Sequence, residues 1–145
     1  MCMIVDANRL GSFLADPVHE DAAPIREWLD RRGGRIVYST GGKFTEEVGH
    51  RLRKKLADYV RAGKAVLVPP HRFANDEAAL APIIGSDDPH VLALARATGV
   101  RLLYTGDGAL RVDFKDKRFI DQPRGKVYSR ASNVNLLTRS ACARR

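Results

Sequence analysis

The chain is poor in cysteine and has no long apolar run, and each shortage excludes a class of protein. Its 145 residues include two cysteines, Cys2 and Cys142, near opposite ends. By themselves they form neither a zinc site nor a disulfide framework. No apolar run approaches the roughly 20 residues of a membrane span, and Asp6 interrupts the apolar start without a basic segment before it. We therefore expect one domain without a signal peptide, in a reducing cytoplasm and away from membranes.

Motifs of several enzyme classes are also missing. The four histidines are scattered without metal-ligand spacing, so they are interpreted as surface or structural residues. The stretch "TGGKFT" is not a phosphate-binding loop, because Phe44 follows the lysine where Ser or Thr is needed and Val37 stands in place of the first glycine. No serine or cysteine nucleophile motif is present.

Negative charge is in the minority. There are 25 Lys and Arg residues against 17 Asp and Glu residues, a formal net charge of +8. Such a balance favours a polyanionic partner, nucleic acid first and an acidic protein second. The alternative is a basic protein with no special partner.

What is present is an alternation of short apolar runs with helical patterns. Strands are predicted at residues 3–6, 35–39, 65–70, 100–105 and 125–128, and helices at residues 8–15, 23–32, 43–62 and 89–98. Residues 71–85 suggest a short helix and a turn, and Asp107 could open a turn before the stretch "GALRVDF". The pattern indicates an α/β domain over residues 1–130, with three α/β/α layers and a central, mostly parallel sheet of four to five strands. Residues 131–145 form a basic tail.

Three acidic residues follow or flank these predicted elements. Asp6 follows the first strand, Asp107 follows the fourth, and Asp88 begins the helix at residues 89–98. In parallel sheets, ligand sites lie at the carboxyl ends of the strands. The acids are therefore expected to meet there, although each could instead serve only as a helix cap or turn residue.

A cluster of carboxylates needs a cation, because the charges repel each other and lose solvation. Oxygen ligands suit Mg²⁺ or Mn²⁺. Such a metal activates water and stabilises the leaving oxygen in phosphodiester cleavage. An acidic cleft within a basic surface is thus one consistent design for a nuclease.

Three stretches carry a resemblance to a known family. "IVDAN", "SDDPHVLALA" and "LLYTGD" resemble, in order and spacing, the three signatures of PIN domains. The resemblance implies a metal-dependent endoribonuclease using Mg²⁺ or Mn²⁺ with RNA as its substrate. It also implies, as one open role, the VapC-like toxin of a toxin–antitoxin pair with an antitoxin protein as partner, and it implies pairing into homodimers.

The resemblance assigns the site residues. Asp6, Asp88 and Asp107 are the expected metal ligands and catalytic acids. Glu47 is the expected fourth catalytic acid, with Glu46 as the alternative.

Further residues are expected to support the site or hold the substrate. Asn8 and Thr105 correspond to polar positions that orient the acids. The basic run "RLRKKL" is a candidate RNA backbone track or a solvated helix face, and its cations are Arg51, Arg53, Lys54 and Lys55.

Two alternatives to this function stay open. The first is a catalytically inactive PIN-like module that binds RNA or a protein through its basic face. The second is a nuclease acting on DNA with the same chemistry. Within the ribonuclease hypothesis, a toxin and a housekeeping or defence enzyme are both open.

Overall fold

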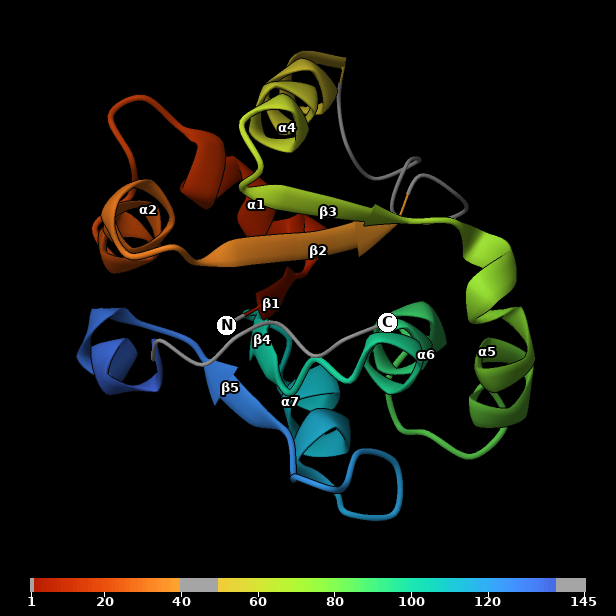
Figure 1. The fold of residues 1–145 in the computed structure, drawn as a ribbon. Coiled ribbons are helices and arrows are strands. Elements are labelled where there is room, and N and C mark those ends of the chain that lie inside the picture. The colour runs from red at the N-terminus through yellow and green to blue at the C-terminus, as the bar shows by residue number, and fades with distance from the viewer. Residues whose placement is uncertain (1, 40–49, 138–145) are drawn as a thin grey trace.

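The computed structural model describes residues 2–39 and 50–137, and its centre is a sheet of five parallel strands (Figure 1). The sheet order is β3-β2-β1-β4-β5. The strands are β1 (Cys2–Val5), β2 (Arg35–Ser39), β3 (Ala65–Val68), β4 (Leu102–Tyr104) and β5 (Lys126–Tyr128). Ile4 at the centre pairs with Val37 on one side and Leu103 on the other. The predicted α/β class with a parallel central sheet is confirmed.

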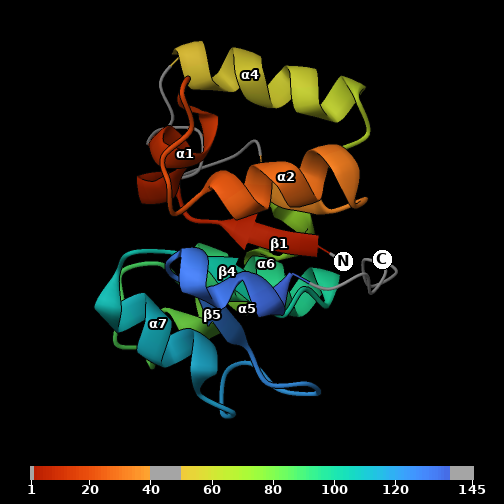
Figure 2. The same cartoon turned by 90° about the vertical axis from the view of Figure 1, so that its left-hand side faces the viewer.

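Helices cover both faces of this sheet (Figure 2). On one face lie α1 (Ala7–Leu14), α2 (Ala23–Arg31) and α4 (His50–Arg61). On the other lie α5 (Ala74–Leu80), α6 (Pro89–Thr98) and α7 (Gly108–Lys115). Two short 3₁₀ segments, η1 (Pro70–Arg72) and η2 (Ala131–Leu136), complete the described elements.

Alternation along the strands divides the apolar side chains between two cores. Met3 and Val5 pack with α1 and α2, whereas Ile4 between them packs on the other side with α6. Leu102 and Leu103 divide in the same way. Successive side chains of a strand point to opposite faces, so a continuous apolar run fills both cores. Each such fully buried side chain contributes roughly 1.5–3 kcal/mol.

The largest difference from the sequence-based expectation is α7. No helix was predicted there, only a turn that Asp107 could open, but Gly108–Lys115 is helical. Leu110 and Phe114, four residues apart, are buried on its inner face, and Asp107 caps its first turn. The helix was missed because Asp107 was considered only as a site acid or a turn opener.

The ends of two other predicted segments also differ. The strand expected at residues 65–70 ends at Val68, because Pro70 begins η1. Only His50–Arg61 of the helix expected at residues 43–62 is described, and residues 43–49 lie outside the described residues. Beyond residue 130, η2 follows and Leu137 is buried in the core with α2, so packed structure continues into the region expected to be a tail.

Cys2, at the start of β1, is buried and disulfide-bonded. The sequence offered no basis for a disulfide at Cys2, and the structure shows one. The chain's other cysteine, Cys142, lies outside the described residues.

The topology brings the start of α6 to the carboxyl edge of the sheet. Gly99 ends α6 with a left-handed φ of 74°, and the chain then enters β4. Since β4 is parallel to β1, α6 runs antiparallel to both strands, and its first residues lie where the strands end.

Among the described residues, no helix combines the length and apolar character needed to cross a membrane.

Candidate functional site

The carboxyl edge of the two central strands joins the first and last sequence signatures. Asp6 follows β1 and is only 4% exposed. Its amide donates to the carbonyl of Tyr104 at 2.9 Å, which continues the pairing of β1 with β4. The Thr105 hydroxyl donates to Asp6 Oδ2 at 2.7 Å. The fold thus brings Asp6 and Thr105 into contact across 99 positions of sequence.

Asp107 is hydrogen-bonded to the same Thr105 hydroxyl and also caps a helix. Its amide donates to Thr105 Oγ1 at 3.0 Å. Its Oδ1 accepts from the amides of Ala109 at 2.9 Å and Leu110 at 3.3 Å. Such caps contribute about 1 kcal/mol. Asp107, considered from the sequence as a turn opener, is therefore a helix cap, and among the described residues this cap uses only Oδ1.

Asp88 stands at the start of α6, where its carboxylate is partly exposed. Its amide donates to Ser86 Oγ at 3.4 Å. The loop before it is held by Asp113 of α7, which accepts from the amides of Gly85 at 3.2 Å and Ser86 at 2.8 Å. One helix therefore begins at Asp107 and also anchors the loop that carries Asp88.

Asp113 is a buried carboxylate that the sequence interpretation did not single out. Its signal was present, since it lies between Leu110 and Phe114 on the buried side of α7. An acid on an apolar helix face needs polar partners, and here the loop amides provide them.

Arg9 of α1 is a second site residue that the sequence interpretation missed. Its guanidinium lies against Gly106, the residue between Thr105 and Asp107. A Cβ atom at Gly106 would overlap Arg9 Nη2 and lie 2.7 Å from Nε. The absence of a side chain at Gly106 therefore lets a cation lie over the loop that joins the acids.

The other residues predicted to support the site or to bind RNA lie on α1 and α4. Asn8 lies on the first turn of α1 with an exposed side chain. Arg53 and Lys54 are exposed on α4, whereas Lys55 Nζ donates to the carbonyl of Leu14 at 2.6 Å and joins α4 to the end of α1. Arg51 is in α4, but its side chain lies outside the described residues.

Within residues 2–39 and 50–137, no three His, Cys, Asp or Glu side chains form a group that could hold a metal ion. Asp6, Asp88 and Asp107 share one edge of the sheet, but they do not make a complete metal site on their own. Glu46 and Glu47 lie outside the described residues.

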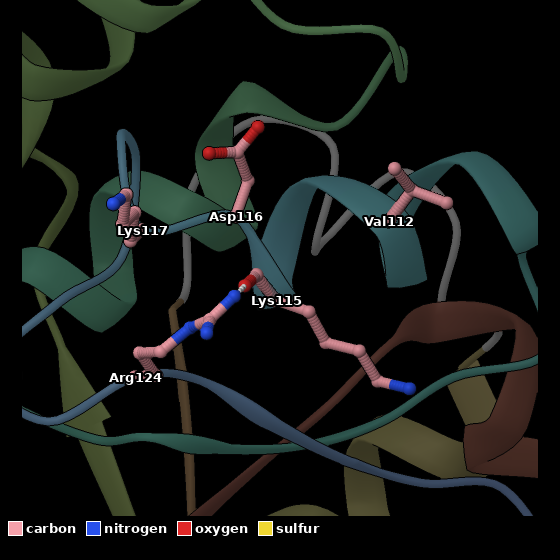
Figure 3. Close-up of a pocket in the computed structure, with 5 residues that line it drawn as sticks. All are labelled: Val112, Lys115, Asp116, Lys117 and Arg124. Atoms are coloured by element: carbon pink, nitrogen blue, oxygen red, sulfur yellow. Dashed lines mark hydrogen bonds between the residues drawn. The ribbon is translucent and has the colours of Figure 1, made fainter.

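A basic hollow of about 580 Å³ lies at the far end of α7 (Figure 3). In Figure 3, Arg124 reaches the carbonyl of Lys115, a hydrogen bond of 3.2 Å, and the amino groups of Lys115 and Lys117 point to opposite sides. Arg118 holds the pKa of Asp116 at about 2 through hydrogen bonds to its carboxylate. The lining residues are Val112, Lys115, Asp116, Lys117 and Arg124.

Comparison of the chain with protein-family models, with curated proteins and with solved structures found no match.

Proposed function

We propose that the protein is a metal-dependent endoribonuclease of the PIN type, with its active site around Asp6. The observation that carries the proposal is the hydrogen bond from Thr105 to Asp6, which joins the "IVDAN" and "LLYTGD" segments at the carboxyl edge of a parallel sheet. Asp88 begins a helix at the same edge. These segments carry the family resemblance.

The hydrogen bonds of Thr105 orient the Asp6 carboxylate. A threonine hydroxyl has one proton, and the Asp107 amide occupies its oxygen as a donor. The hydroxyl proton is then directed at Asp6 Oδ2, which accepts it. The Thr105 hydroxyl therefore orients Asp6 Oδ2 as a hydrogen-bond acceptor.

The metal ligands would be Asp6, Asp88 and Asp107, with Glu47 as the fourth acid. Asp107 can contribute Oδ2, because Oδ1 caps α7. A bound Mg²⁺ or Mn²⁺ would supply an activated water and stabilise the leaving oxygen. The described acids alone do not complete this set, so the proposal requires an acid from outside the described residues.

The positive charge of the chain is the basis for RNA as the proposed partner. A net charge of +8 and exposed cations on α4 favour binding of the RNA backbone. An antitoxin protein, a homodimer and a cytoplasmic location are parts of the same proposal. The disulfide at Cys2 is the observation against a reducing cytoplasm, because stable disulfides are rare there.

A catalytically inactive binding module is the second candidate. It is favoured by the absence of a complete metal-binding group among the described residues. Such a module would bind RNA through the same cations and leave it uncut.

The test is cleavage of a mixed RNA pool by the purified protein with Mn²⁺, with Mg²⁺ and with EDTA. We expect metal-dependent cutting that Asp6→Asn abolishes without loss of folding. Asp30→Asn is the matched control, because Asp30 pairs with Lys64 just before β3, at the opposite edge of the sheet. Cutting by Asp6→Asn at the rate of the unmodified protein would refute the proposed site. RNA bound but never cut would favour the second candidate.

A further inference from the structure

Arg9 has an unusual place beside the acids. It lies in the first half of α1, and its amide donates to the carbonyl of Asp6 at 2.9 Å. Its guanidinium extends to Gly106, in the loop that leads from Thr105 to Asp107. A cation is therefore placed between the two strand ends that carry the site acids.

The guanidinium has no acceptor among the described residues. Within residues 2–39 and 50–137, Arg9 Nε is buried without a hydrogen bond, and no ion pair within 4.0 Å involves Arg9. Arg9 as a whole is half-buried, but leaving its buried Nε–H donor without an acceptor is costly. A cost of this kind at a candidate site suggests that the missing acceptor arrives with a ligand.

The charge of Arg9 also acts on the core beneath the site. Burial raises the pKa of Tyr104, the last residue of β4, and the charge of Arg9 opposes that increase. This effect agrees with the position of the guanidinium at the end of β4. Arginine is suited to such a position, because its planar fork of donors matches two oxygens of a phosphate.

We propose that Arg9 is a substrate-binding residue whose guanidinium contacts a phosphate of single-stranded RNA at the Asp6 edge. This inference rests on the proposed function for the identity of the polyanion. Gly106 is the structural condition for it, because only a residue without a side chain leaves space for the guanidinium.

Gly106→Ala tests the geometry with little disturbance of the backbone. Gly106 does not have a left-handed φ, so alanine is not strained there, and the atoms it meets are the flexible end of Arg9. The substitution should therefore displace the guanidinium and leave the fold intact. Gly108→Ala is the matched control two residues later, where a Cβ would meet nothing within 4 Å.

The measurement is the Kd of a fluorescein-labelled single-stranded RNA in EDTA, by fluorescence anisotropy over a series of KCl concentrations. Arg9→Met and Gly106→Ala should each raise Kd about tenfold or more, the range expected for a lost charged hydrogen bond. In Arg9→Met, the slope of log K against log salt should become shallower by about 0.7, the value for one phosphate contact in single strands. Arg9→Lys should restore the salt slope and only part of the affinity, and Gly108→Ala should behave as the unmodified protein.

The double variant Arg9→Met/Gly106→Ala identifies the cause. If Gly106→Ala acts through Arg9, adding it to Arg9→Met changes Kd no further. Equal melting temperatures of the single variants would exclude general unfolding as the reason for weaker binding.

Unchanged Kd and salt slope in Arg9→Met would overturn the inference, as would a full additional loss in the double variant. Its failure is distinguishable from failure of the proposed function. Binding that depends on Arg9 without cleavage in Mn²⁺ would remove the catalytic proposal alone. Cleavage that depends on Asp6 and is indifferent to Arg9 would remove the Arg9 inference alone.

Discussion

At the scale of single residues, Thr105 organises the candidate site. It is fully buried, and its hydroxyl donates to Asp6 and accepts from the amide of Asp107. The sequence indicated a supporting polar residue here. Only the fold shows that a single hydroxyl joins the two acids, because its partners come from different strand ends.

Thr105→Val should weaken both stability and cleavage. Valine has nearly the shape of threonine but leaves the Asp107 amide without its acceptor and Asp6 without its donor, at a cost of about 1–3 kcal/mol. Urea unfolding measures the stability, and initial rates on the RNA pool should fall at least tenfold.

Thr105→Ser keeps the hydroxyl and serves as the control for this prediction. A valine variant that cuts RNA as fast as the serine variant would show that the hydrogen bond to Asp6 has no part in the reaction.

At the scale of elements, the basic side chains of α4 have two different roles. The sequence suggested one shared role for them. Lys54 is exposed, whereas Lys55 Nζ is bonded to the carbonyl of Leu14. Adjacent residues of a helix point in different directions, so one lysine reaches solvent while the next reaches α1. The basic run was therefore a mixture of surface charge and a structural contact.

Two methionine substitutions on α4 should affect different properties, one the stability of the fold and the other RNA binding. Lys55→Met should lower the free energy of unfolding by about 1 kcal/mol, because the Leu14 carbonyl loses its donor. Lys54→Met should leave unfolding unchanged and weaken RNA binding. Urea unfolding and fluorescence anisotropy on both variants check this, and equal behaviour of the two lysines in both assays would contradict it.

At the scale of the whole molecule, burial of the tyrosines makes the stability of the fold depend on pH. All four tyrosines of the chain have a pKa above the ordinary value, with burial as the largest cause. The ring of Tyr128 in β5 stands edge-on to the ring of Tyr104. Burial is the largest cause that raises the pKa of Tyr128 to about 12, and the neighbouring Tyr104 and Asp21 add to it. The folded protein therefore keeps the tyrosine protons longer than the unfolded chain does.

The stability should consequently fall at alkaline pH. The unfolded pKa of tyrosine is 10.0, and the folded pKa of Tyr128 is higher, so its contribution is complete below pH 10.0 and is lost as pH rises toward about 12. Thermal unfolding from pH 9 to 12, with tyrosinate absorbance recorded in parallel, measures this loss. Tyr128→Phe should show a shallower decline, and an identical decline in both proteins would contradict the assignment.

The sequence alone determined the fold class and the approximate position of most elements. The apolar run Cys2–Val5 is buried on both faces, and that pattern identifies a covered parallel strand. Pro89 and Gly99 bound α6 by their own backbone preferences. These features are local, so they can be recognised without knowing what packs against them.

Only the tertiary structure decided which polar groups meet. The guanidinium of Arg9 over Gly106 and the buried Asp113 beneath the Asp88 loop depend on contacts between segments distant in sequence. The sequence contained no periodic signal for these pairs. A hydrogen bond between distant residues depends on strand order and helix placement, which arise when the whole chain packs.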